Sequence, residues 1–256
     1  MQSLLLHPLR DALYEAVSET APEAEIAVAF SGGVDSTLLA RICEDLGKEI
    51  TLITVGFPGS HDVHFSSTIA SKMQMKQRIY EIEYDDFRNK LRSVQELVRC
   101  ENTSHMENCI AYLYVSKVAR DAGLNVVLSA NGCDELFCGY NAYRMAHDGG
   151  EVALMKLMEE KIANELALVA EIATISDQFG VEVRQPFLSE KFIRFAKSIP
   201  LDRKIKGPDD MVRKHILRKI AIEMGVPRES ALKPKKALQY GSSIHKHFKK
   251  LRAQQV

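Results

Sequence analysis

Short apolar runs alternate with longer segments of helical apolar spacing through the first half of the chain. The apolar runs predict buried strands at residues 26–30, 49–55, 78–84 and 125–129. Apolar residues spaced three and four apart predict helices at 9–17, 36–46, 62–75, 85–98 and 108–122. Short strands that alternate with helices pair in parallel through right-handed crossovers. The pattern therefore predicts an α/β fold, a parallel twisted sheet with helices on both faces.

The strand signals stop after Gly149-Gly150, and only helical spacing follows. It predicts helices at residues 153–175, 187–199, 211–224 and 244–251. We expect an α/β part over residues 1–148 and a mostly helical part over 149–256 that packs on it, with the two glycines as a hinge. A single continuous domain is the alternative.

The composition is that of an ordinary soluble globule, with 256 residues, 46% hydrophobic and 27% charged. No apolar run approaches the roughly 20 residues that a membrane-spanning helix needs. The N-terminal apolar stretch is too short for a signal peptide and lacks a basic region. We expect a cytoplasmic protein with no membrane partner.

The net charge of zero hides an asymmetry. Residues 201–256 contain 15 Lys or Arg residues and 5 Asp or Glu residues, a net charge of +10, so residues 1–200 carry −10. The default interpretation is a solvated face, and the alternatives are a subunit contact, a nucleic-acid footprint and a lid over a polyphosphate. No aromatic platform accompanies the charge, so a nucleic-acid partner is not expected. Five cysteines, an odd number, argue against a disulfide framework.

The segment Ser31-Gly32-Gly33-Val34-Asp35-Ser36 joins the first predicted strand to its helix. Adjacent glycines let the backbone approach a ligand closely and adopt positive φ at little cost. The first turn of the helix presents unpaired N–H groups and a partial positive charge, so the turn is suited to a phosphate. The spacing is neither that of a Walker A loop nor that of a Rossmann fingerprint. A tight connection with Asp35 or Ser36 capping the helix is the alternative.

The second informative segment, Ser129 to Tyr140, follows the last predicted strand and contains Asp134-Glu135. Ligands of parallel sheets sit beyond the carboxyl ends of the strands, so we expect this segment and the 31–36 loop to share a site. Mg²⁺ binds together with ATP and is coordinated by carboxylate and phosphate oxygens, which makes Asp35 and Asp134 the natural metal ligands. Alternatively, Asp134 and Glu135 favour a helix start through the helix dipole.

Several motifs, in order, give the chain a family resemblance. Ser31 to Ser36 resembles the pyrophosphate-binding loop (PP-loop) of ATP pyrophosphatases, and the whole set resembles the synthetase domain of asparagine synthetases. Residues 54–62 look like that family's strand-two loop, which contacts adenine and ribose. Residues 129–140 resemble its Ser-Gly-Glu-Gly-x-Asp-Glu-Leu-Phe-x-Gly-Tyr element. Similar motifs follow at 180–188, 214–218 and 233–241.

The resemblance implies an adenine nucleotide alpha-hydrolase-like fold, with ATP and Mg²⁺ as cofactors. It implies an ATP-dependent ligase that adenylates a small carboxylate, aspartate by resemblance, releases pyrophosphate and passes the acyl group to ammonia or another amine. Lys235 matches the family's catalytic lysine, and the basic segment around it would close over the triphosphate. Asp134 and Asn131 are the other candidate catalytic residues. Asp35 and Asp134 are the implied metal ligands. The implied nucleotide-binding residues are Phe30, Ser31, Gly32, Gly33, Asp35, Ser36, Val55, Ser129 and Ala130.

The chain departs from the family pattern in three ways. The family's enzymes begin with a glutaminase half whose nucleophile is a cysteine, whereas residue 2 here is Gln2. We therefore expect nitrogen from free ammonia, an amine or a separate glutaminase subunit. Asn131 replaces the family's glutamate, and an amide cannot accept a proton, so an altered nucleophile or acceptor is open. Cys133 and Cys138 stand where small or polar residues are usual, and Ser189 replaces an aspartate.

Other interpretations stay open at this point. Thiols beside an adenylating site suggest a sulfurtransferase that uses Cys133 or Cys138, or persulfide or iron–sulfur chemistry there, although buried cysteines usually act as compact apolar residues. A nucleotide-binding subunit without catalysis is a further alternative, and a homodimer is one option for the oligomeric state. Arg184 could bind a substrate carboxylate or pair with Glu182 or a helix end. Tyr140 and Tyr143 are candidate walls of the acceptor pocket.

Overall fold

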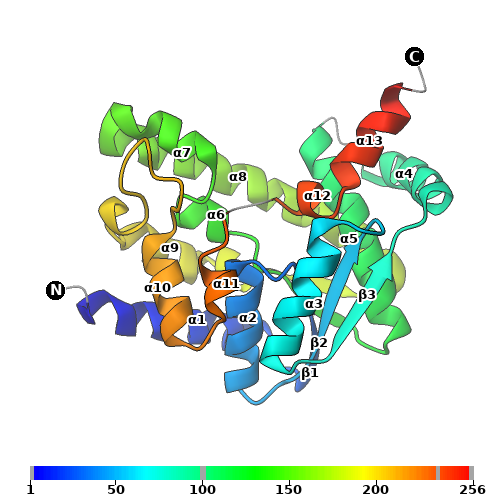
Figure 1. Ribbon diagram of the computed structural model, residues 1–256, viewed down its shortest axis with the longest axis horizontal. Helices are drawn as coiled ribbons and strands as arrows, with labels where there is room; N and C mark the ends of the chain where they lie inside the picture. The colour runs from blue at the N-terminus through cyan, green and yellow to red at the C-terminus, as the bar shows by residue number, and fades with distance from the viewer. Residues whose placement is uncertain (1–2, 99–101, 235–236, 254–256) are drawn as a thin grey trace.

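A five-stranded parallel sheet with helices on both faces forms the centre of the protein. The computed structural model describes residues 3–98, 102–234 and 237–253 (Figure 1). The strand order is β3-β2-β1-β4-β5, and every pairing is parallel. The strands are β1 (Glu25–Ala29), β2 (Glu49–Gly56), β3 (Gln77–Glu81), β4 (Val126–Leu128) and β5 (Glu182–Arg184). The fold class expected from the sequence is confirmed.

Successive side chains of a strand point to opposite faces of the sheet, so the apolar core has two parts, one on each face. Ile26 and Val28 of β1 pack into one apolar cluster with α1 and α2, while Ala27 packs into the other with α5. The helices of the first part of the chain are α1 (Ser3–Thr20), α2 (Val34–Asp45), α3 (His61–Met73), α4 (Tyr84–Val98), α5 (Thr103–Asp121), α6 (Cys133–Leu136) and α7 (Asn141–Ala146).

The later helices pack mainly on α1, α2 and α5 and on β5. Figure 1 shows α8 running across the molecule from α7 toward α5, and α13 lying near α4 at the opposite side from α9 and α10. These helices are α8 (Gly150–Ser176), α9 (Glu190–Ser198), α10 (His215–Glu223), α11 (Arg228–Ala231), α12 (Leu238–Gly241) and α13 (Ile244–Ala253). Within the described part of the chain, none of the helices has the length and apolar character that crossing a bilayer requires.

The expectation that strands stop at Gly149-Gly150 is wrong. β5 lies beyond the glycines and pairs with β4, with Val127 opposite Val183. The pattern did not predict β5 because the strand has only three residues, and the two at its ends, Glu182 and Arg184, are charged. Residues past 149 therefore complete the sheet, while the division of the chain at this point stays a prediction.

Several predicted boundaries also shift, for local reasons. The strand predicted at 78–84 ends at Glu81, and α4 begins at Tyr84. α5 begins at Thr103, five residues early, because the Asn102 side chain accepts hydrogen bonds from the Ser104 and His105 backbone N–H groups. α10 begins only at His215, since the two residues before it have a left-handed backbone.

Candidate active site

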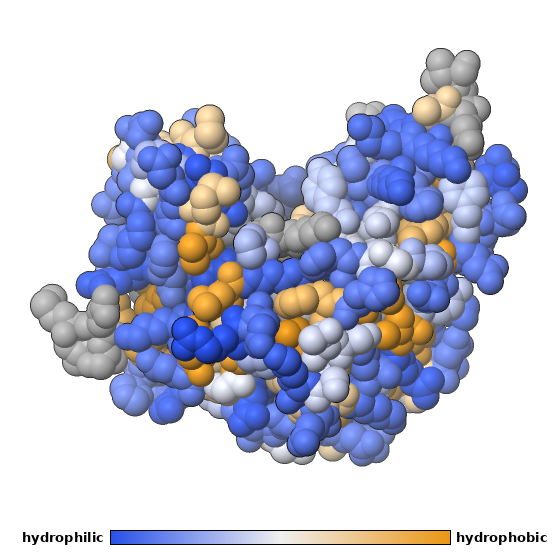
Figure 2. All heavy atoms as spheres, in the orientation of Figure 1, coloured by the Kyte–Doolittle hydropathy of each residue, from blue (hydrophilic) through white to orange (hydrophobic). Residues whose placement is uncertain are grey.

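A cavity of about 450 Å³ opens at the carboxyl ends of β1 and β4. β2 and β3 lie on one side of β1, and β4 and β5 lie on the other. β1 and β4 therefore form the topological switch point of the sheet. Figure 2 shows the surface hollowed between the side built from α7 and α9 and the side built from α12 and α13. The residues predicted from the sequence that line the cavity are Phe30, Ser31, Gly33, Asp35, Ser36, Val55, Ser129, Ala130, Asn131 and Asp134.

Two predicted residues stand apart from this lining. Gly32 is not among the residues that line the cavity. Its role is conformational: φ is +73°, and a Cβ there would lie 3.0 Å from Phe65 Cδ1 and 3.1 Å from Ser66 Cα. Only glycine meets both conditions. Lys235 lies outside the described residues, although Lys233 and Pro234, immediately before it, line the cavity.

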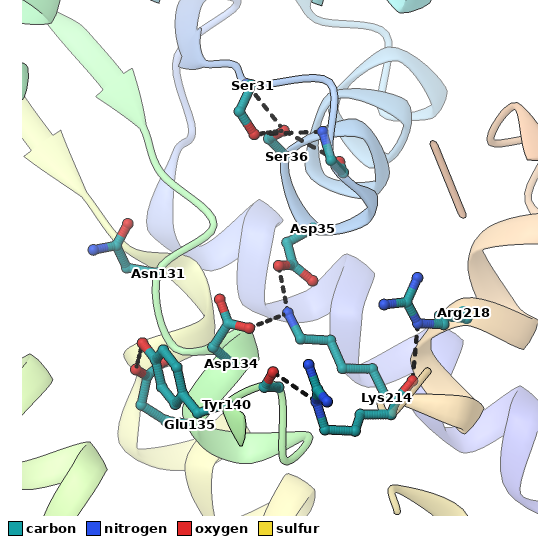
Figure 3. A network of polar contacts seen from close by, with 12 residues as sticks. Ser31, Asp35, Ser36, Asn131, Asp134, Glu135, Tyr140, Lys214 and Arg218 are labelled. Atoms are coloured by element: carbon teal, nitrogen blue, oxygen red, sulfur yellow. Dashed lines mark hydrogen bonds and ion pairs between the residues drawn. The ribbon is translucent and has the colours of Figure 1, made fainter. Parts of the chain in front are cut away.

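The first turn of α2 faces this site without a side-chain cap. Gly33 occupies the N-cap position with an extended backbone, and no side chain caps the helix there. The alternative in which Asp35 or Ser36 caps the helix is therefore wrong. The Ser36 hydroxyl instead donates to the Gly33 carbonyl at 3.2 Å and lies 3.3 Å from Ser31 Oγ. Figure 3 shows the Ser31 and Ser36 side chains next to each other. Helix N–H groups and two hydroxyls thus form a turn suited to an anion.

A lysine that the sequence did not single out joins the two predicted metal ligands. Lys214 Nζ lies 2.5 Å from Asp35 Oδ2 and 2.7 Å from Asp134 Oδ1 (Figure 3). The lysine side chain is 1% exposed. Burial alone would lower the pKa of Lys214, but the charges of Asp134 and Asp35 outweigh it and raise the pKa above its ordinary value. The lysine is therefore charged, and it bridges the loops after β1 and β4.

The backbone around Lys214 is held in an unusual conformation. Arg213 and Lys214 have φ values of 51° and 54°, in the left-handed region that costs a non-glycine residue about 1–3 kcal/mol. Arg213 Nε donates to the Gly139 carbonyl at 3.0 Å, and Arg218 Nε donates to the Arg213 carbonyl at 2.8 Å. A Cβ at Gly139 would lie 1.9 Å from Asp134 Oδ1 and 2.3 Å from Lys214 Cε. The Asp134–Gly139 turn therefore requires glycine where the lysine passes.

The two aspartates fit a hard divalent cation in their chemistry. Asp35 Oδ1 is buried and has no hydrogen-bond partner among the described residues, so this carboxylate keeps an oxygen available. Within the described part of the chain, no three His, Cys, Asp or Glu side chains cluster in a way that would hold a metal ion. Asp35 and Asp134 would therefore supply two ligands, and phosphate oxygens and water would complete the set, as is usual for Mg²⁺ with nucleotides.

A second polar group lies on the opposite wall of the cavity, where α8 meets the loop after β4. Asn131 Nδ2 donates to Glu165 Oε1 at 2.5 Å, and the Tyr112 hydroxyl donates to Asn131 Oδ1 at 2.7 Å. The Tyr140 hydroxyl donates to Glu135 Oε1 at 2.5 Å. Burial, reinforced by the nearby charges of Glu165 and Asp134, raises the pKa of Glu135 to about 8.

The remaining candidate residues divide between the cavity and the core. Tyr140 lines the cavity, but Tyr143 is fully buried and donates to the Glu135 carbonyl. Arg184 donates to Glu23 at 2.9 Å and to Glu182 at 2.5 Å and is not a cavity residue, which favours the ion-pair interpretation.

The two cysteines of the second motif pack as core residues. Neither Cys133 nor Cys138 lines the cavity, and both side chains are fully buried. Burial raises the pKa of Cys133 well above its ordinary value and that of Cys138 to about 12. Because the thiolate is the reactive form, this environment favours the compact apolar interpretation.

Sequence reasoning missed Lys214, Glu135 and Glu165 as site residues. Lys214 falls in the motif at 214–218, but the sequence assigns it no role. Asp134 and Glu135 are predicted together at a helix start beside the site, and the pattern gives Glu135 no role of its own. Glu165 lies within a long amphipathic helix, where a glutamate ordinarily faces solvent, and nothing in the local pattern distinguishes it. Only the packing of α8 against the loop after β4 brings it to Asn131.

Comparison with known sequences decides the family. The sequence model described as asparagine synthase matches residues 8–174 and 155–255. The chain belongs to the asparagine synthase family. This confirms the resemblance that the motifs carried.

Two curated members of the asparagine synthase family give the scale of the similarity. The putative asparagine synthetase (glutamine-hydrolyzing) 1 of Methanocaldococcus jannaschii is 29% identical over 260 residues, covering 89% of this chain and 47% of that protein. Asparagine synthetase B (glutamine-hydrolyzing) of Escherichia coli is 28% identical over 269 residues, covering 97% and 47%. The chain spans about half the length of the curated relatives it matches.

Two solved structures are weakly similar. One is a predicted subunit of tRNA methyltransferase from Methanocaldococcus jannaschii, with a TM-score of 0.38 and 17% identity over 84% of this chain and 94% of that one. The other is the NH3-dependent NAD synthetase of Campylobacter jejuni, with a TM-score of 0.37 and 18% identity over 55% and 61%.

Proposed function

We propose that this protein is an ATP-dependent ligase that adenylates a small carboxylate, releases pyrophosphate and forms an amide by transfer of the acyl group to ammonia or another amine. The observation that carries the proposal is the meeting of the 31–36 loop with the loop after β4, joined by the ion pairs of Lys214 with Asp35 and Asp134. Membership of the asparagine synthase family supports the same chemistry. Aspartate is the acceptor that the named relatives suggest.

Each wall of the cavity has a role in this proposal. Ser31, Gly33 and Ser36 bind the pyrophosphate part of ATP at the first turn of α2, where the helix dipole favours negative charge. Asp35 and Asp134 hold Mg²⁺, which neutralises charge on the phosphates when it is bound. Phe30, Val55, Ser129 and Ala130 line the space for the nucleoside.

Two lysines supply positive charge to the same place. Lys214 keeps the two aspartates together, and Lys235 stabilises the charge that develops on the reacting phosphate. Support for Lys235 comes from its neighbours: Lys233 lines the cavity, and the Arg218 guanidinium binds the Lys233 carbonyl at 2.9 Å. This contact ties the basic segment to the cavity.

The nitrogen source is free ammonia, an amine, or ammonia from a separate glutaminase subunit. The named relatives are glutamine-hydrolyzing enzymes about twice the length of this chain, and this supports a partner of that kind. Mixing the protein with a glutaminase and glutamine, and comparing amide formation with that from ammonium salts, separates these sources.

Exchange of labelled pyrophosphate into ATP, measured across a panel of carboxylic acids with Mg²⁺, tests the adenylation step. We expect exchange that depends on one acid or a few related ones. Asp35→Asn should reduce it about 100-fold, because a charged group at the phosphates is lost. Absence of exchange with every acid would instead favour a nucleotide-binding subunit without catalysis.

The matched control is Glu44→Gln, on the same helix α2. Glu44 is 42% exposed and pairs with Arg41 at the surface, away from the cavity. This variant should retain wild-type exchange. Full exchange in Asp35→Asn would contradict the role of Asp35.

A further inference from the structure

The proposed reaction requires a proton acceptor as well as a phosphate site. Ammonia and primary amines are mostly protonated at neutral pH, and a protonated nitrogen has no lone pair with which to attack an acyl carbon. Asp134, Glu135 and Asn131 of the loop after β4 line the cavity, and Asn131 stands where the family motif has a glutamate. Its amide donates and accepts hydrogen bonds but does not take up a proton. Asp134 pairs with Lys214, and Glu135 accepts a hydrogen bond from the Tyr140 hydroxyl. The carboxylate that contacts Asn131 comes from another element, α8.

The contacts of Asn131 fix which way its amide points. The Tyr112 hydroxyl donates to Asn131 Oδ1 at 2.7 Å, and the Ser129 hydroxyl contacts the same oxygen. Tyr112 in turn is buried and lies 2.5 Å from Ser129 Oγ. With its oxygen occupied by hydroxyl donors, Asn131 directs Nδ2 toward α8. There it donates to Glu165 Oε1 at 2.5 Å.

Glu165 is placed for proton transfer in the cavity. It is 7% exposed, and it lines the cavity together with Lys161 and Asn164 of the same helix. Asn131 donates to Glu165 Oε1, so a neutral donor orients the carboxylate. Burial is the largest cause of the raised pKa of Glu135, and the charge of Glu165 is the next.

We propose that Glu165 accepts the proton of the incoming ammonium or primary ammonium group, and that Asn131 is its positioning residue. This inference rests on the proposed function. One proton passes from nitrogen to the Glu165 carboxylate, and the freed lone pair attacks the acyl carbon. The C–N bond forms, the C–O bond to AMP breaks with its electron pair leaving on AMP, and the second proton leaves nitrogen for the departing phosphate.

Two nucleophiles that differ in charge test this role. Ammonium must lose a proton before it can attack, whereas hydroxylamine is mostly neutral at neutral pH. We expect Glu165→Gln to reduce ammonium-dependent amide formation about 100-fold while hydroxamate formation falls less than about threefold. Acid-dependent pyrophosphate exchange should stay within about threefold of wild type, which also reports that the variant is folded.

The control variant is Glu160→Gln, at an exposed position five residues earlier on α8. It should match wild type with both nucleophiles. Equal loss of the ammonium and hydroxylamine reactions in Glu165→Gln, or loss of pyrophosphate exchange with them, would overturn the proposal, as would unchanged ammonium-dependent activity. A wild-type protein without exchange for any acid would remove the proposed function itself, and the inference with it.

A swap of the two side chains provides a second test. Because Asn131 and Glu165 are hydrogen-bonded partners, the double variant Asn131→Glu/Glu165→Gln keeps an amide–carboxylate pair and moves the carboxylate across the contact. We expect the ammonium-dependent activity of the double variant to be at least about tenfold higher than that of Glu165→Gln. No recovery, with pyrophosphate exchange intact, would show that the carboxylate at this contact is not the acceptor.

Discussion

At the scale of single residues, the centre of the site is a buried cation between two carboxylates. Lys214 Nζ contacts Asp35 and Asp134 at the same time, and Gly139 leaves the space in which the lysine passes. The desolvation of a lysine is offset only because both carboxylates are close and well aligned. Lys214 therefore sets the distance between the loops after β1 and β4.

Replacing this cation should destabilise the protein. Lys214→Met removes the cation and leaves the two carboxylates together. Breaking a buried ion pair in this way costs about 3–5 kcal/mol of unfolding free energy. Mg²⁺ should raise the melting temperature of the variant more than that of wild type. Urea unfolding with and without Mg²⁺ measures these effects.

Lys219→Met is the matched control, on the exposed face of α10, where the Lys219 side chain is 46% exposed. Its unfolding free energy should change by less than about 0.5 kcal/mol. A Lys214→Met variant as stable as wild type would mean that the two aspartates do not need the lysine.

At the scale of elements, short irregular segments rather than long helices place the site residues. The segment before α10 turns at Asp210, whose carboxylate accepts backbone N–H groups from Lys206 at 2.8 Å and from Arg213 at 3.0 Å. It also contacts His215 Nε2 at 2.7 Å. This turn carries the left-handed pair Arg213 and Lys214 toward the cavity.

The pKa of Asp210 predicts how this turn depends on pH. Burial raises the pKa, but hydrogen bonds from the backbone N–H groups of Arg213 and Lys206 and from His215 outweigh it, and the pKa falls to about 2. A lowered carboxylate pKa stabilises the fold above the unfolded value, and that stability is lost as pH falls through about 2. Asp210→Asn should therefore lower the unfolding free energy by about 1–2 kcal/mol at neutral pH.

The difference between Asp210→Asn and wild type should disappear as the pH approaches 2, which denaturant unfolding at a series of pH values can follow. Asp209→Asn is the neighbouring control, because Asp209 is exposed. A constant difference at every pH would show that the charge of Asp210 is not what stabilises the turn.

At the scale of the whole molecule, the half of the chain after Gly149 completes both the sheet and the site. β5 covers the edge of β4, α8 packs against α5, and Lys214 reaches the loops of the first half. The motifs at 31–36 and 129–140 therefore do not make a full site by themselves.

A fragment of residues 1–148 should not fold as an independent unit. Without α8 and β5, the apolar strand β4 and the inner face of α5 are exposed to solvent. We expect dye binding typical of exposed apolar surface and a broad, non-cooperative thermal transition by circular dichroism. A cooperative transition and ATP binding by the fragment would support a separable domain at the Gly149-Gly150 boundary.

The local pattern was sufficient for the parallel sheet, the alternation of its helices and the meeting of the 31–36 and 129–140 loops, because strand ends in a parallel sheet share one edge. It failed for β5, whose three residues are too few to show a period, and for the start of α10, which a left-handed pair of residues sets. The alternative in which Asp35 or Ser36 caps α2 is also wrong, because Gly33 holds the N-cap position without a side-chain cap.

The sequence by itself determined the family, the fold class and the loops that face the cavity, since these depend on motifs and periodicities written within a few tens of residues. Only the tertiary structure decided that Lys214 joins Asp35 to Asp134 and that Glu165 meets Asn131. The physical reason is that both contacts join residues far apart in the chain. Whether a buried lysine or glutamate is tolerated depends on partners that only folding brings within reach.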